Sequence, residues 1–232
     1  MKTLLTLLLL TAIAAPCAQA GTILGSVRAQ GKTEVPSNDA GGAYASRKYK
    51  FAERVDYASM HDFVVYLKGP VGTNPVVPPS QPLVVNTSRV TQEGAVFNPH
   101  VLPVVAGTTV EWPNNDQIFH NVFSASEPKS FDLGLYKGNP PEKRVTFDKP
   151  GRVDVFCSIH ANMHCVVLVL DNPYFASVDD RNHYSISNVP PGTYQLTAWH
   201  ERMPPQTKTV IVPESGEVNA DFVLGITGLP KY

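Results

Sequence analysis

The chain has 232 residues, with 19 Lys and Arg against 20 Asp and Glu, so its formal net charge is −1. This balance argues against a nucleic-acid-binding protein, which needs an excess of basic side chains to neutralise phosphates. Hydrophobic residues make up 43% and charged residues 17%, as in folded globular proteins, while 21 Pro and 16 Gly interrupt the chain too often for a helical bundle.

Residues 1–20 predict a cleaved export signal. A single Lys precedes a run of apolar residues, and the tripeptide Ala-Gln-Ala at 18–20 has the small-x-small pattern of a signal peptidase site. The apolar run is shorter than the roughly 20 residues that a membrane-spanning helix needs. A lipid anchor on Cys17 is a minor alternative, disfavoured by the proline before it. We expect a mature protein that begins near Gly21, is exported to a bacterial periplasm and has no membrane span.

Beyond the signal, the sequence predicts an all-β protein. Short runs rich in Val, Ile, Thr, Tyr and Phe alternate with clusters of Pro, Gly, Asn and Asp, which favours a β-sandwich or barrel. No segment keeps a helical period over three turns, and the best helix candidate, 48–60, is weak. In chain order, the expected strands are 22–28, 62–67, 82–86, 101–105, 108–112, 121–124, 143–147, 152–157, 165–170, 184–186, 193–199, 208–212 and 220–224.

The residues that carry chemistry lie between about 86 and 170. Cys157, His160 and Met163 form the pattern Cys-x2-His-x2-Met at the end of an expected strand. A thiolate, an imidazole and a thioether on one tight loop are soft ligands that select copper, especially Cu(I). Two His and one Cys with a weak axial Met are the signature of a blue-copper electron-transfer centre. The remaining ligand must come from elsewhere, and His120 is the natural candidate because it follows a polar turn and precedes apolar residues.

This segment resembles a cupredoxin of the plastocyanin/amicyanin type. In that family a His-Asn pair, here His120-Asn121, precedes the Cys-x2-His-x2-Met loop, and the short spacing to the Met is closer to amicyanin. The residues Phe97-x-Pro99 and the stretch 104–116 match as well. The resemblance implies a Greek-key β-sandwich and one type 1 copper, with Asn121 hydrogen-bonding toward the turn that contains Ser158. The implied copper ligands are His120, Cys157, His160 and Met163.

The same residues allow other interpretations. Cys-x2-His could belong to a structural zinc site, although a Met ligand fits zinc poorly. A disulfide between Cys157 and Cys165 would remove the thiolate, and we favour Cys165 as a buried free thiol that packs as a small hydrophobe. His164 is expected to face solvent beside the site, with a role as an extra ligand as the alternative. His61 and His100 are expected to be ordinary surface residues.

The flanking residues predict a second, smaller β-sandwich. The alternating pattern around Pro190-Pro191-Gly192 predicts a hairpin, and it resembles the carboxypeptidase-regulatory-like, transthyretin-like fold. Pieces of that fold also occur at 21–27 and 63–67. We therefore expect a signal at 1–20, an N-terminal β segment and Pro-rich linker at 21–81, the cupredoxin domain at 82–170 and further sandwich strands at 171–232, with the cupredoxin inserted into the sandwich.

Within this second unit, the stretch 199–201, Trp-His-Glu, could be a further metal or catalytic site. We expect instead a core Trp followed by polar turn residues.

The predicted function is electron transfer rather than catalysis. The His-x-His pairs of multicopper enzymes, the Cys-x3-Cys of dinuclear copper centres and a recognisable Ser/His/Asp triad are absent from the sequence. A one-electron carrier that serves a redox partner protein of unknown identity is therefore expected. The alternative is a copper-binding or copper-delivery protein without redox turnover, which the scarcity of Met residues disfavours. The likeness to amicyanin alone suggests a third role, as an accessory factor in amine oxidation.

Overall fold

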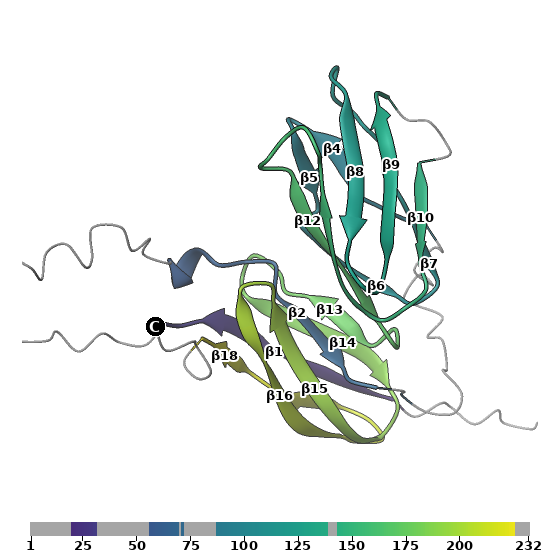
Figure 1. Cartoon of the computed structure of the whole chain (residues 1–232). Helices are drawn as coiled ribbons and strands as arrows, with labels where there is room; N and C mark the ends of the chain where they lie inside the picture. The colour runs from purple at the N-terminus through teal and green to yellow at the C-terminus, as the bar shows by residue number, and fades with distance from the viewer. Residues whose placement is uncertain (1–19, 32–55, 70, 72–86, 139–142, 226–232) are drawn as a thin grey trace, which may run out of the picture.

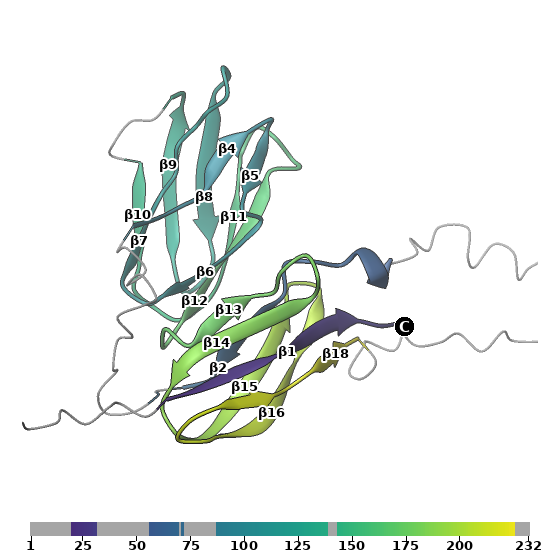
Figure 2. The ribbon, with the colours of Figure 1, turned by 180° about the vertical axis from the view of Figure 1, so that it is seen from behind.

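The computed structural model of the chain describes residues 20–31, 56–69, 71, 87–138 and 143–225. Within these residues the protein is built from strands and one 3-10 turn, η2 (Tyr57–Ser59), so the all-β prediction is confirmed. The strands gather into two bodies, one above the other in Figure 1, and the view from behind in Figure 2 shows the same division.

The upper body is a sandwich formed by the middle of the chain. Its larger sheet has the order β6-β12-β11-β8-β9, its smaller sheet the order β10-β7-β3, and β4 and β5 form a separate hairpin. Buried side chains from these sheets, Trp112, Phe147 and Val153 among them, form one core. The strands are β3 (Thr87–Arg89), β4 (Thr91–Glu93), β5 (Val96–Asn98), β6 (Val101–Val105), β7 (Thr108–Glu111), β8 (His120–Ala125), β9 (Ser130–Tyr136), β10 (Arg144–Phe147), β11 (Gly151–Phe156) and β12 (His164–Leu170).

The lower body combines strands from both ends of the chain. β1 pairs with β14, β17 and β18, with Ile23 opposite Ile186, and a second sheet has the order β13-β2-β15-β16. The upper body is thus entered after β2 and left before β13. The strands are β1 (Gly21–Ala29), β2 (Val64–Leu67), β13 (Phe175–Ser177), β14 (His183–Val189), β15 (Gly192–His200), β16 (Met203–Val212), β17 (Glu217–Asn219) and β18 (Phe222–Leu224).

Strand β12 joins the two bodies. Its residues alternate between two apolar environments: Cys165, Val167 and Val169 belong to the upper core, whereas Val166, Leu168 and Leu170 pack in a separate cluster with Val64 and Trp199 of the lower body. A strand buried on both faces needs no polar alternation, which explains the continuous apolar run of its sequence.

Several sequence predictions need correction. The predicted hairpin around Pro190-Pro191-Gly192 is wrong, because β14 pairs with β1 while β15 pairs with β16 and β2, so the turn crosses between sheets. An alternating pattern identifies a strand but does not specify its partner. Strands β3, β4, β5, β9, β13 and β17 were not predicted.

Some predictions fall outside the described residues. These are the signal at 1–19, the strand 82–86, most of the linker and most of the helix 48–60, of which the structure describes only the region of the η2 turn. In the part of the chain that is described, no helix combines the length and the apolar character needed to cross a bilayer.

Candidate metal centre

Antiparallel pairing of β8 and β11 brings two distant segments together. Phe123 of β8 lies opposite Phe156 of β11, so the start of β8 meets the end of β11 at one edge of the sandwich. His120 is the first residue of β8, and the loop between β11 and β12 begins with Cys157. The fold therefore places the predicted fourth ligand beside the Cys-x2-His-x2-Met loop.

The nitrogen and sulfur atoms of these residues converge. The Nδ1 atoms of His120 and His160 are 3.0 Å apart, and the Cys157 Sγ lies 3.6 Å from the His160 Nδ1. One ligand atom from each of the three residues lies within 4.8 Å of the other two. Around one ion with tetrahedral angles, two nitrogens would be roughly 3.4 Å apart and a nitrogen and a sulfur roughly 3.6 Å. The donor set therefore fits a single metal ion.

Met163, the last residue of the Cys-x2-His-x2-Met pattern, is buried in the core of the upper body. Its side chain is 1% exposed and packs in the same core cluster as Cys157. The backbone N–H of Cys157 donates to the Met163 carbonyl oxygen over 3.2 Å, and the Met163 N–H donates to the His160 carbonyl oxygen over 3.0 Å. These bonds close the loop on itself and keep Met163 in the core cluster that also contains Cys157.

Asp116 orients His120. The His120 ring is fully buried, and its Nε2 lies 2.7 Å from the Asp116 Oδ2. Backbone N–H groups of Ala95 and Gly94 also donate to Asp116, and these bonds, together with the one from His120, lower the pKa of its carboxyl. An ionised carboxylate only accepts, so the proton sits on Nε2 and the Nδ1 lone pair faces His160 and Cys157.

Asp116 is the last residue of the stretch 104–116 that matches the family pattern, and its role beside His120 was not predicted. An acidic residue four positions before the His was the available signal.

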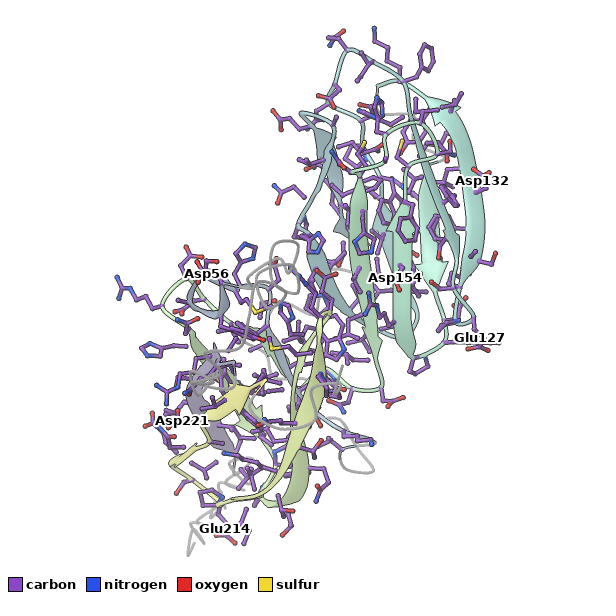
Figure 3. All side chains as sticks on the ribbon, turned by 60° about the vertical axis from the view of Figure 1, so that its left-hand side comes forward. Asp56, Glu127, Asp132, Asp154, Glu214 and Asp221 are labelled. Carbon is purple, nitrogen blue, oxygen red and sulfur yellow. The ribbon has the colours of Figure 1, made fainter. Side chains whose placement is uncertain are left out.

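The hydrogen bonds of Asn121 differ from the expected ones. Its backbone N–H donates to the Cys157 Sγ over 3.4 Å, whereas its side-chain amide donates to Asp132 over 2.6 Å and not to the turn after Cys157. Asp132, at the outer edge of the upper body in Figure 3, also accepts from the Gly134 N–H, and both bonds lower its pKa. Asn121 thus fixes β8 to β9 and touches the sulfur through its backbone. Ser158 is exposed.

Cys165 is a free, buried thiol, as predicted, and Cys157 is also free. Burial raises the pKa of Cys165 far above its ordinary value, so the group stays protonated and unreactive. The thiol at 157 is therefore available to a metal without competition from a disulfide.

The other histidines separate into two groups. His61 is a surface residue as expected, with its side chain 80% exposed next to Asp62. The expectation that His100 is an ordinary surface residue is wrong, because its Nε2 lies 2.9 Å from Glu201 and its Nδ1 lies 3.2 Å from the His164 carbonyl oxygen. The His164 Nε2 lies 2.9 Å from Asp154 and its Nδ1 lies 3.9 Å from Glu201, and His164 is not one of the residues that converge with Cys157. Glu201 was expected to be a polar turn residue, so its contact with His100 was not predicted.

Residues 84–170 match the sequence model of the copper-binding proteins of the plastocyanin/azurin family. The matched segment contains all four predicted ligands. The match and the ligand geometry together support a copper-binding protein of the electron-transfer type. A search of curated proteins finds no match to the chain.

Three solved structures are each similar to a little over a third of the chain. A Cu-containing nitrite reductase from Thermus scotoductus SA-01 is 29% identical over 37% of this chain and 23% of its own, with a TM-score of 0.35. A purple cupredoxin from Nitrosopumilus maritimus is 23% identical over 35% of this chain and 98% of its own, with a TM-score of 0.30. A reduced, Cu(I) form of an amicyanin variant is 24% identical over 36% and 81%, with a TM-score of 0.32. The chain thus spans less than a quarter of the nitrite reductase.

Proposed function

We propose that the mature chain is an exported type 1 copper protein that carries single electrons to or from a protein partner. The convergence of the His120, His160 and Cys157 ligand atoms, with Met163 buried beside them, is the observation that supports this function. Copper, when bound, supplies the one-electron redox couple.

The protein's own residues would hold the ion rigidly. Two imidazoles, the thiolate and the Met163 thioether would ligate it, and Asp116 would keep the His120 ring in place through Nε2. A site anchored at the start of β8 and in a loop closed by backbone hydrogen bonds changes little in geometry between oxidation states, which favours transfer of an electron over release of the ion.

The surroundings of His160 support a docking face. His160 is half-buried, whereas His120 is fully buried, so the edge of the His160 ring is the shortest route from the site to solvent. Large apolar side chains next to the ligands are exposed: Phe119 by 57%, Ile118 by 48% and Ile159 by 51%. Exposed apolar side chains around a site are typical of a surface that binds a partner. We propose that electrons enter and leave through His160 and that the protein itself is not an enzyme.

The second candidate is a copper-delivery protein without redox turnover. Such a protein would need an exposed, easily exchanged site, whereas here Met163, Cys157 and His120 are buried. Burial of these three ligands therefore favours an electron carrier over a copper-delivery protein.

Addition of Cu²⁺ to the purified mature chain tests the proposal. We expect an intense visible band from thiolate-to-Cu(II) charge transfer, bleached by a reductant and restored by an oxidant through many cycles. Cys157→Ser should abolish the band. The matched variant Cys165→Ala, which removes the other buried thiol, should keep it. If copper binds while Cys157 is reduced and the visible band does not appear, the electron-carrier proposal is wrong.

The flanking strands and the export signal complete the proposal. We propose that the strands on either side of the copper segment form a carboxypeptidase-regulatory-like, transthyretin-like sandwich into which that segment is inserted. The pairing of β1 with β14, β17 and β18 supports this arrangement. Periplasmic location follows from the signal pattern at 1–20, and N-terminal sequencing of the secreted protein would test it.

A further inference from the structure

A second group of ligand-type side chains lies where the two bodies meet. His100 precedes β6, His164 opens β12, and Glu201 lies in the turn between β15 and β16 of the lower body. One ligand atom from each residue lies within 4.8 Å of the other two. His100 and Glu201 are 101 positions apart in the chain, so the group forms only when the two bodies are docked.

The carboxylate of Glu201 faces one nitrogen of each ring. Its Oε1 lies 2.9 Å from the His100 Nε2, and its Oε2 lies 3.9 Å from the His164 Nδ1. The two rings stand edge to face with centroids 5.4 Å apart. The three side chains are only partly exposed, by 35%, 25% and 16% for His100, His164 and Glu201.

The remaining ring nitrogens are already used. The His100 Nδ1 lies 3.2 Å from a backbone carbonyl oxygen, and the His164 Nε2 lies 2.9 Å from the Asp154 Oδ1. Both oxygens can only accept, so both of these nitrogens carry protons. In neutral rings the lone pairs then belong to the His100 Nε2 and the His164 Nδ1, which both point at Glu201. Lone pairs that face a carboxylate repel it, and either a proton or a metal ion between them removes that repulsion.

We propose that His100, His164 and Glu201 bind a divalent first-row metal ion that ties the two bodies together. Two imidazoles and one carboxylate are an established ligand set for Zn²⁺, with a further position left to water. Asp154, which bonds to the outer nitrogen of His164, is the type of partner that orients a metal-binding His. Cu²⁺ prefers the same donors and generally binds more tightly, so both ions belong to the class.

The charges around the group are compatible with a cation. Asp154 and Glu201 supply two negative charges, and the nearby guanidinium of Arg152 is paired with Asp154 at 2.7 Å and donates to the Glu201 carbonyl oxygen at 2.9 Å. Arg152 therefore contacts the backbone of Glu201 and is not paired with its carboxylate.

Calorimetric titration of the full mature chain with Zn²⁺ tests this site. The chain is first loaded with one equivalent of copper to occupy the Cys157 site, and we expect it to bind one further equivalent of Zn²⁺. Glu201→Gln should weaken that binding at least tenfold. The matched variant Glu214→Gln should not change it, because Glu214 is exposed at the far end of the lower body (Figure 3). Competition with Cu²⁺ then ranks the two ions.

Two further sets of variants separate loss of Zn²⁺ binding from misfolding and from failure of the copper site. His100→Gln removes a ligand from the upper body and should also weaken Zn²⁺ binding tenfold or more, with circular dichroism unchanged. In the Cys157→Ser chain, the difference between Glu201→Gln and Glu214→Gln should persist, so failure of the blue-copper proposal does not affect this test. If Glu201→Gln and Glu214→Gln bind the same number of Zn²⁺ ions with the same affinity, the group is an ion pair only and the proposed site is wrong.

Discussion

Within the proposed copper site, the pair formed by Asp116 and His120 decides which ring nitrogen faces the other predicted ligands. The carboxylate accepts from the His120 Nε2 and from two backbone N–H groups of the β4–β5 turn, Gly94 and Ala95. One acidic side chain therefore links the His120 ring to the β4–β5 turn. Such partners of metal-binding His residues typically change metal affinity by 10- to 100-fold.

Asp116→Asn should accordingly lower copper affinity by about 10- to 100-fold, because an amide holds the His120 proton less firmly than a carboxylate. Competition with a chelator of known affinity measures the change. Asp179→Asn is the matched control, since Asp179 also accepts from backbone N–H groups, those of Arg181 and His183, but in the lower body. Equal affinities for the two variants would contradict the role of Asp116.

Met163→Leu should keep the visible band and raise the reduction potential. The side chain is buried and Leu has a similar volume, so the core tolerates the change. Loss of the thioether removes a donor that stabilises Cu(II), and a tenfold shift toward Cu(I) corresponds to about 59 mV. Redox titration of the visible band measures the shift. An unchanged potential would mean that Met163 does not contact the metal.

Among the elements, β1 depends on close contact with the C-terminal strands. A Cβ at Gly25 would lie too close to the Ala220 carbonyl oxygen, so only glycine allows this approach. Asp221, in the same connection, accepts from the backbone N–H and the hydroxyl of Ser26. These contacts fasten the first strand to the last part of the described chain.

Asp221→Asn should make the lower body less sensitive to acid. The backbone N–H and then the hydroxyl of Ser26 lower the pKa of Asp221, so its stabilising effect is complete above the unfolded pKa of about 3.9 and is lost as the pH falls through the folded pKa. Because Asp221 is exposed, the loss at neutral pH should be below about 1 kcal/mol. Denaturant unfolding between pH 2 and 7, with Ser26→Ala as the second arm of a double-mutant cycle, measures it. Identical pH profiles for the wild type and the variant would contradict this assignment.

How far the sequence predicts these elements depends on their length and context. Cys157, His160 and Met163 share one loop, so their spacing alone indicates a site. Strands β4 and β5 have three residues each, too few to show alternation, and β9 contains Gly134, which weakens a strand pattern.

The group formed by His100, His164 and Glu201 could not be predicted from the sequence. Its members come from segments that no local pattern relates, and they meet only through the docking of two sandwiches. The same limit explains the wrong hairpin at β14 and β15, because the choice of partner strand is a property of the whole fold.

At the scale of the molecule, the two bodies share an apolar junction with a polar edge. Val101 and Leu168 of the upper body pack with Val64 and Trp199 of the lower body, and the Arg152 guanidinium lies 6.0 Å from the Trp199 ring. Figures 1 and 2 show β6, β12 and β13 side by side at this level. Through this junction the upper body packs directly against the lower body.

Leu168→Asp should separate the two bodies without destroying the copper site. The new carboxylate would be unpaired at the junction, which costs about 3–5 kcal/mol, while the opposite face of β12 stays intact. Small-angle scattering should show a larger radius of gyration, and thermal unfolding should split into two transitions. Val167→Asp, one residue away but in the upper core, should abolish the visible band instead. A single transition and unchanged dimensions in Leu168→Asp would show that the junction does not hold the bodies together.

The two-sided burial of β12 also limits how the protein can be divided in the laboratory. A recombinant fragment that spans 84–170 would expose Val166, Leu168 and Leu170 to water as a continuous aliphatic stripe. Such a fragment should self-associate and lose solubility unless these positions are made polar. The segment that matches the copper-binding family is thus bounded in sequence, but it depends on its neighbour to cover these apolar side chains.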